Sequence, residues 1–202
     1  MQLIGMLDSP YVRRVAISLR LLDMPFEHQP VSVFSTFEQF RAINPVVKAP
    51  TLVCDNGVVL MESGLILDYL ETQAGRSLMP SGGSARQHAL RIAGLALAAC
   101  EKTVQIVYER NLRPAEKQHE PWLARVRGQL LAACSALETE LAGVALPADE
   151  RTLTQADVTT AVAWRFTQMM LPEEVDASAY PVLASFSAAA EQLAAFKDTP
   201  PL

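Results

Sequence analysis

The stretch M-L-D-S-P-Y-V-R-R-V at residues 6–15 marks the point where the chain passes from a strand into a helix. Gln2–Leu7 is apolar enough for a short buried strand, and apolar residues recur along Pro10–Leu22 at the spacing of one helical face. Proline suits the first helical turn because its missing N–H would be unpaired there, so Ser9 or Asp8 is expected to be the N-cap. Ser9 then has two interpretations. It is a cap contributing about 1 kcal/mol, or a hydroxyl that joins a helix N-terminus in stabilising a bound anion.

Short strands and helices alternate through the first part of the chain. The predicted strands are Gln2–Leu7, Phe26–Val31, Thr51–Cys54 and Val58–Met61, and the predicted helices are Pro10–Leu22, Phe37–Ile43 and Ser63–Gln73. Asp55-Asn56-Gly57 predicts a hairpin between the last two strands, because these residues tolerate a positive φ. Gly75 is expected to close the last helix as its C-cap. The predicted order is βαβ, then a helix, then ββα.

The second part of the chain has a purely helical pattern, which follows a predicted linker, R-S-L-M-P-S-G-G-S at 76–84. Apolar residues three and four apart predict helices at Ala85–Leu112, Leu123–Leu141, Val158–Met170 and Val182–Leu193, with a loop at Gly143–Thr152. Thr154-Gln155-Ala156-Asp157 fits a capping pattern for the third of them. We therefore predict an α/β domain at residues 1–76 and an all-helical domain at residues 84–202.

Composition and charge narrow the class of protein. The chain has 202 residues, half of them hydrophobic, and a formal net charge of -5, whereas nucleic acids and anionic membranes favour a basic face. No apolar run approaches the roughly 18 residues of a membrane span, and the start M-Q-L-I-G-M-L-D lacks the basic residues of a secretory signal. We expect a cytoplasmic enzyme or binding protein with neither nucleic acid nor membrane as its partner.

Cysteine and histidine provide no metal or disulfide signal. Cys54, Cys100 and Cys134 are far apart and odd in number, and the three histidines join no ligand cluster. Buried free thiols in a reducing compartment are expected, and no metal.

Four local motifs in this order resemble the soluble glutathione transferases over nearly the whole chain. They are S-P-Y-x-R at Ser9–Arg13, N-P-x-x-K-x-P at Asn44–Pro50, E-S at Glu62-Ser63 and T-x-x-D at Thr154–Asp157. The resemblance implies a thioredoxin-like N-terminal domain followed by a helical bundle. Within the family, S-P-Y-V-R-R is most similar to a bacterial serine-type group with S-P-F/Y-V-R at this place.

The resemblance implies an enzyme that conjugates reduced glutathione to a small electrophile. Ser9 would stabilise the thiolate of glutathione, because a thiol with a pKa near 8.5 is mostly protonated at neutral pH. Pro50 would follow a cis bond, and the Ala49 backbone would pair with the peptide. Valine at position 47, where the family commonly has glycine, narrows this loop. Lys48 is either a solvated surface charge or a partner for a ligand carboxylate.

The remaining implied contacts are with the γ-glutamyl end of glutathione and with the second substrate. Glu62 would pair with the ammonium, while Ser63 and the helix start hold the carboxylate. Without a ligand, the same pair would be an N-cap, Ser63, beside an acid near the positive helix end. The electrophile pocket is expected between the two domains, with walls drawn from Tyr11, Tyr108, Arg110, Arg113 and Trp164.

Several alternatives stay open from the sequence. The two arginines at 110 and 113 hint at an acidic cosubstrate, and the Tyr11 hydroxyl ranks below that of Ser9 because it falls inside the helix. A non-catalytic or regulatory glutathione-binding protein of this fold, or a glutathione-dependent isomerase or dehalogenase, would retain the same motifs. The resemblance also implies a homodimer.

Overall fold

The computed structural model describes residues 1–147 and 149–201 of the chain. These residues form two compact units. The first contains Met1–Leu78 together with Asp149–Leu153 and the C-terminal residues from Leu193, and the second contains residues 79–147 and 154–192. The predicted class, an α/β fold followed by an all-helical one, is confirmed.

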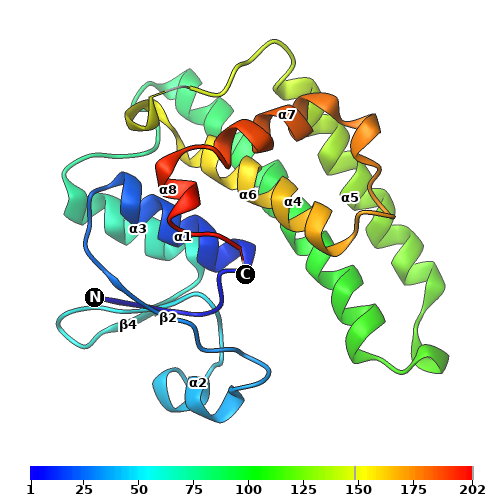
Figure 1. Cartoon of the computed structure of the whole chain (residues 1–202), viewed down its shortest axis with the longest axis horizontal. Coiled ribbons are helices and arrows are strands. Elements are labelled where there is room, and N and C mark those ends of the chain that lie inside the picture. Colours follow the sequence, from blue (N-terminus) through cyan, green and yellow to red (C-terminus); the bar gives the residue numbers. More distant parts are fainter. Residues whose placement is uncertain (148, 202) are drawn as a thin grey trace. The chain divides into compact units, whose positions relative to one another are not determined.

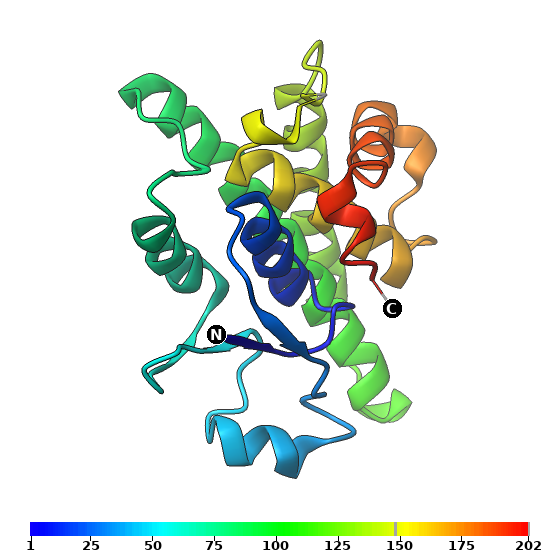
Figure 2. The same ribbon diagram turned by 60° about the vertical axis from the view of Figure 1, so that its left-hand side comes forward.

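A four-stranded mixed sheet forms the centre of the first unit (Figure 1). Its strands are β1 (Gln2–Ile4), β2 (Glu27–Gln29), β3 (Thr51–Val53) and β4 (Val59–Met61), in the order β2-β1-β3-β4. β1 runs parallel to β2 and antiparallel to β3, which is antiparallel to β4. The helices α1 (Pro10–Leu21) and α3 (Ser63–Ala74) lie on one side of the sheet, and α2 (Phe37–Ile43) lies on the other (Figures 1 and 2).

Successive residues of β1 face opposite sides of the sheet, as the pleat requires. Ile4 packs with Val31 and Phe40 in the core beneath α2. Leu3, which points the other way, is fully buried and lies opposite Leu52 of β3. Because both faces of this short strand are covered, the sequence has a continuous apolar run instead of an alternating one.

Gly5 ends β1 earlier than the sequence predicted. The strand stops at Ile4 instead of Leu7. Gly5 follows it with φ of 138°, a backbone conformation that residues with a side chain rarely adopt. A Cβ at Gly5 would lie 2.6 Å from Val12 Cγ2 and 3.4 Å from Ala49 Cβ. The glycine therefore lets the chain turn tightly from β1 toward α1.

The second unit is a bundle of four helices (Figure 2). They are α4 (Gly83–Leu112), α5 (Glu120–Glu140), α6 (Gln155–Met170) and α7 (Pro181–Ala190), and every strand of the described residues belongs to the first unit. The predicted capping box opens α6, since Thr154 Oγ1 accepts from Asp157 N and the Asp157 carboxylate accepts from Thr154 N. A buried hydrogen bond of 2.9 Å joins the Thr103 and Thr167 hydroxyls, linking α4 to α6.

Three short 3-10 turns lie between the longer helices. The predicted loop at 143–152 includes residue 148, which lies outside the described residues, and it ends in a 3-10 turn at Glu150–Thr152. A second such turn, Ala115–Lys117, precedes α5 and a third, Ala177–Ala179, precedes α7. Within the described ranges, no helix combines the length and apolarity that crossing a bilayer demands.

The C-terminal segment belongs to the first unit, although the sequence placed it in the helical domain. It contains the short helix α8 (Ala194–Lys197), which lies beside α1 (Figure 1). Arg13 of α1 is buried, and its Nε donates to Thr199 O at 2.8 Å while Nη2 donates to Phe196 O at 3.4 Å. A guanidinium at the carbonyl end of a helix is favourable, so Arg13 holds this segment across 186 positions of sequence.

Candidate functional site

Strand register brings three of the predicted motifs to one end of the sheet. Ile4 of β1 lies opposite Thr51 of β3, which in turn lies opposite Met61 of β4. The next residue toward this end is Gly5 on β1, Pro50 on β3 and Glu62 on β4. Since neighbouring strands are about 4.8 Å apart, the three segments that continue from them begin within roughly 10 Å of one another.

Ser9 caps α1 at this end of the sheet. It is half-buried with extended backbone, Pro10 occupies the first helical position, and Ser9 Oγ accepts from Val12 N at 3.5 Å. The predicted cap is therefore confirmed, with a long side-chain contact. The hydroxyl keeps its own proton for donation, and the first turn of α1 carries no acidic residue to neutralise the helix terminus.

The segment from Asn44 to Thr51 is held by a buried polar chain. Asn44 Oδ1 accepts from Val46 N at 3.1 Å, and Asn44 Nδ2 donates to Thr51 Oγ1 at 2.8 Å. Thr51 Oγ1 donates onward to Lys48 O at 2.7 Å. Asn44 is only 2% exposed, so these bonds form away from water and fix the loop that presents Lys48.

The bond between Ala49 and Pro50 is cis, as the resemblance implied. Ala49 is half-buried, and no turn or loop hydrogen bond among the described residues occupies its backbone. The Lys48 side chain is exposed and takes part in none of the described ion pairs. Val47 has φ of 53°, in the left-handed region that favours glycine.

Glu62 is the N-cap of α3, a position for which the sequence had offered Ser63. Its φ is 73°, and its carboxylate accepts from Gly64 N and Leu65 N, both at 3.1 Å. Ser63 is the first helical residue and is 1% exposed, with Oγ accepting from Arg14 Nη1 at 3.2 Å. The exposed group of the pair is therefore the Glu62 carboxylate, and the Ser63 hydroxyl lies behind it.

Together these segments suit a small zwitterionic peptide. Two helix N-termini favour anions, an exposed carboxylate favours a cation, and the Ala49 backbone suits an added strand. Among the described residues, no three His, Cys, Asp or Glu side chains come together as metal ligands.

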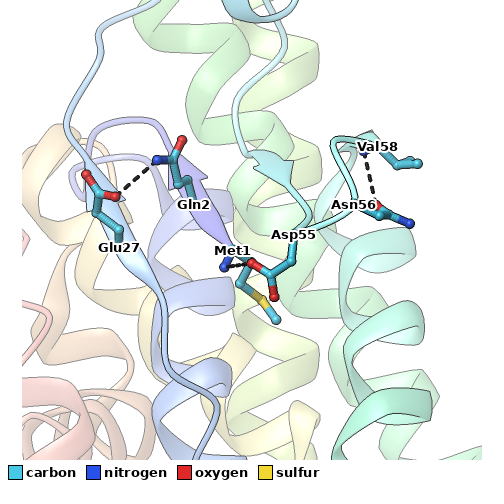
Figure 3. A network of polar contacts seen from close by, with 6 residues as sticks. All are labelled: Met1, Gln2, Glu27, Asp55, Asn56 and Val58. Carbon is cyan, nitrogen blue, oxygen red and sulfur yellow. Dashed lines mark hydrogen bonds and ion pairs between the residues drawn. The ribbon is translucent and has the colours of Figure 1, made fainter.

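The opposite end of the sheet has a different character (Figure 3). The N-terminal ammonium pairs with Asp55 there, and Gln2 Nε2 donates to Glu27 Oε2 at 3.0 Å. A cavity of about 720 Å³ opens beside these residues, lined in part by Cys54. Neither Ser9 nor Glu62, the N-caps of α1 and α3, lines this cavity, which lies at the end of β3 away from Pro50. We therefore do not assign the candidate site to it.

All three cysteines are buried and free, as the sequence indicated. Burial raises the pKa of the Cys134 thiol to about 12. A hydrogen bond with Cys54 raises the pKa of the half-buried Tyr69 hydroxyl. Cys54 follows β3 at the end away from Pro50, so it does not replace Ser9 as the sulfur-handling group.

Three of the residues expected to form the electrophile pocket line cavities of the second unit. Tyr108 and Arg113 line a mainly apolar cavity of about 320 Å³ together with Trp122. Arg110 instead lines another cavity, of about 230 Å³. Trp164 is 6% exposed and packs edge-on against Tyr180 at 5.8 Å between ring centroids. Trp164 is therefore a buried core residue that packs against Tyr180.

Trp122 was missed by the sequence reasoning, which took α5 to begin at residue 123. An aromatic residue directly after Pro121 at a helix start was the available signal. Tyr11 lies half-buried inside α1, as expected.

Both arginines that suggested an acidic cosubstrate are paired with carboxylates. Arg113 Nε lies 2.8 Å from Glu109 Oε2, and Arg110 pairs with Glu174, which also binds Arg127 Nε at 2.9 Å. Both charges thus have carboxylate partners within the helical unit, and an acidic cosubstrate stays a prediction.

The class defined by this fold is a thioredoxin-like domain, with the candidate site at one end of its sheet, followed by a helical domain. Residues 3–78 match the model of the glutathione S-transferase N-terminal domain, and residues 120–189 match that of the C-terminal domain. The chain belongs to the glutathione S-transferase family. The predicted family is therefore confirmed, and the bacterial serine-type subgroup stays a prediction.

Individual relatives support the same family. A glutathione transferase family member from Pseudomonas fluorescens Pf-5, solved with bound S-(propanoic acid)-glutathione, is 30% identical, with 100% of this chain and 99% of that chain covered and a TM-score of 0.83. A glutathione S-transferase from Methylobacterium radiotolerans, in complex with glutathione sulfonate, is 26% identical over 99% of this chain and 94% of its own, with a TM-score of 0.89. Glutathione S-transferase U6 of Arabidopsis thaliana is 29% identical over 143 residues, which cover 70% of this chain and 60% of that protein.

Proposed function

We propose that this protein binds reduced glutathione and transfers it to a small electrophile, with Ser9 stabilising the thiolate. The observation that supports the proposal is that the segments leading to Ser9, to Ala49-Pro50 and to Glu62-Ser63 all start from the same end of β1, β3 and β4. The roughly 10 Å across β1, β3 and β4 equals the length of an extended tripeptide, about 10 Å. The glutathione derivatives bound to the Pseudomonas and Methylobacterium relatives support the same ligand.

Each end of the tripeptide has a partner in this arrangement. The Glu62 carboxylate binds the γ-glutamyl ammonium, and the start of α3 at Ser63 binds the γ-glutamyl carboxylate. The Ala49 backbone, before Pro50, pairs with the cysteinyl backbone as an added strand would. The exposed Lys48 ammonium pairs with the glycine carboxylate.

Ser9 acts on the cysteinyl sulfur. The Ser9 hydroxyl donates to the sulfur anion while the N-terminus of α1 adds a favourable electrostatic field, so the bound thiol loses its proton to solvent more readily. Each unit by which the thiol pKa falls corresponds to about 1.4 kcal/mol of preference for the thiolate. The thiolate then forms a carbon–sulfur bond with the electrophile, whose leaving group or π bond takes the electron pair.

Titration calorimetry with reduced glutathione and turnover with chloronitroarenes, epoxides and unsaturated carbonyl compounds test this function. Binding together with loss of free thiol and formation of the thioether supports a transferase. Binding without turnover of any electrophile supports the non-catalytic or regulatory alternative. Regeneration of free glutathione after the substrate is converted supports an isomerase or dehalogenase, and absence of glutathione binding overturns the proposal.

We also propose that the protein is a cytoplasmic homodimer, which rests on its family. Multi-angle light scattering at micromolar concentration tests the assembly, with a mass near twice the 22.0 kDa of the chain as the expected result. A mass of one chain across the concentration range contradicts it.

A further inference from the structure

Arg14 brings a buried positive charge to the start of α3. It lies on α1, is 4% exposed, and its Nη1 donates to Ser63 Oγ at 3.2 Å. Burying a guanidinium is costly unless its donors are used, and the bond to Ser63 uses one of them. The contact joins two elements that are 49 positions apart and that both begin at the candidate site.

The direction of this hydrogen bond determines what the Ser63 hydroxyl does. A guanidinium has donors and no acceptor, so Arg14 must donate and Ser63 Oγ must accept. The hydroxyl has a single proton, which is then directed to another acceptor, and Glu62 Oε1 lies 3.4 Å from it. The polar chain therefore runs from the buried charge through Ser63 to the exposed Glu62 carboxylate.

Gly64 constrains the same carboxylate from the other side. A Cβ at Gly64 would lie 3.0 Å from Glu62 Oε2, closer than nearly all such contacts. Glycine in a helix costs roughly 0.5–1 kcal/mol relative to alanine, and the structure shows no positive φ here that would require it. The space above Gly64 is used by Glu62, whose carboxylate folds back to cap Gly64 N and Leu65 N.

We infer that Arg14 is a positioning residue for recognition of the ligand ammonium. Acting through Ser63, and with the space left by Gly64, it holds the Glu62 carboxylate in the one orientation that caps α3 and faces solvent. The inference rests on the proposed binding of glutathione and adds to it a residue on α1 that touches no ligand. The ligand group that senses Arg14 is the ammonium, because the Glu62 carboxylate is exposed whereas the Ser63 hydroxyl is buried. The ligand carboxylate is bound by the N-terminus of α3 and not by that hydroxyl.

Calorimetric titration of two ligands tests the inference. One is reduced glutathione, and the other is glutaryl-cysteinyl-glycine, which lacks only the ammonium. The wild-type protein is expected to prefer glutathione by about tenfold, the value of one charge-assisted contact. Arg14→Gln is expected to weaken the binding of glutathione about fivefold and the binding of the deaminated peptide less than twofold. The two effects differ because Arg14 is coupled to the ammonium contact, which the deaminated peptide lacks. Arg13→Gln, a buried arginine one position away that holds the C-terminal segment, is the matched control and keeps the full preference.

Two further variants probe the same chain if Arg14→Gln folds poorly. Ser63→Ala removes the hydroxyl that links Arg14 to Glu62. It is expected to reduce the preference for glutathione over the deaminated peptide to the same extent. Gly64→Ala is expected to reduce it while the midpoint of urea unfolding stays the same or rises, which no general loss of structure could produce. If Arg14→Gln and Ser63→Ala weaken both peptides equally, the inference is wrong while glutathione binding stands. If the wild-type protein binds neither peptide, the proposed function falls with it.

Discussion

Replacing Asn44 with alanine perturbs the loop that presents Lys48 and Ala49 without touching the proposed ligand. The substitution removes the donor to Thr51 Oγ1 and the acceptor for Val46 N. It also frees the Thr51 hydroxyl, which is oriented toward Lys48 O. We therefore expect both the stability of the first unit and its affinity for glutathione to fall.

The magnitude follows from burial. Each hydrogen bond contributes about 1 kcal/mol net, and a buried group left without a partner costs a further 1–3 kcal/mol or so. Because Asn44 is 2% exposed, water does not replace its bonds, and we expect a loss of about 2–4 kcal/mol in the free energy of unfolding. We expect glutathione affinity to fall on the order of tenfold, or about 1.4 kcal/mol.

Asn56 provides a matched control at the other end of the sheet (Figure 3). Its Oδ1 accepts from Val58 N at 3.1 Å, the same turn and distance as Asn44 with Val46, but its side chain is exposed. Asn56→Ala is expected to cost about 0.5 kcal/mol, since water replaces the bond, and to leave glutathione affinity unchanged.

Urea unfolding gives the two stabilities and titration calorimetry gives the two affinities. Thr51→Val, which keeps the shape of the side chain, serves if Asn44→Ala does not fold. Equal losses of stability for the two asparagine variants, or unchanged glutathione affinity in Asn44→Ala, would refute the reasoning.

Three other predictions each concern a single side chain. Lys48→Ala should raise the Kd for glutathione a few-fold, since an exposed ion pair contributes about 0.5–1 kcal/mol. Titrations at high salt should show a smaller difference between the variant and the wild type. An effect that does not depend on salt would contradict an ion pair. Arg13→Met should cost about 2–4 kcal/mol in urea unfolding, because it removes two buried hydrogen bonds and leaves Thr199 O without its donor, while Phe196 O keeps the bond from Thr199 N. Arg20→Met, which loses the exposed stacking on Phe26, should cost less than about 1 kcal/mol. Similar losses for the two variants would show that the C-terminal segment is not held by Arg13. The raised pKa of Cys134 keeps its thiol protonated in the folded chain, whereas the same thiol ionises in the unfolded chain. The free energy of unfolding should therefore fall as pH rises from 9.0 toward about 12. Cys134→Ala should remove that part of the pH dependence when unfolding in urea is measured across alkaline pH.

Local signals predicted the parts of the fold that depend on neighbouring residues. The helix Phe37–Ile43 was predicted with its observed bounds, because Asn44-Pro45 stops it from within the sequence. Gly75 ends α3 in the left-handed conformation at φ of 67°, and the Thr154–Asp157 box opens α6. Each of these signals lies within four residues of the feature that it predicts.

The features that sequence reasoning placed differently depend on residues distant in the chain. Glu62, and not Ser63, caps α3, because Arg14 from another helix occupies the Ser63 hydroxyl. The C-terminal segment joins the first unit through Arg13. Hydrophobic periodicity indicates local secondary structure and cannot predict a contact between residues so far apart in the chain. Trp164 packs against Tyr180, which precedes α7 and lies 16 positions further along the chain.

The thiol pKa of bound glutathione, followed by thiolate absorbance, tests the role of Ser9 most directly. In complex with the wild-type protein, the pKa should lie at least about one unit below the 8.5 or so of a free thiol. Ser9→Thr, which keeps the hydroxyl, should retain most of that decrease, and Ser9→Ala should lose it together with conjugation activity. A wild-type complex with an unshifted thiol pKa, or a Ser9→Ala complex that keeps both the low pKa and the activity, contradicts the account.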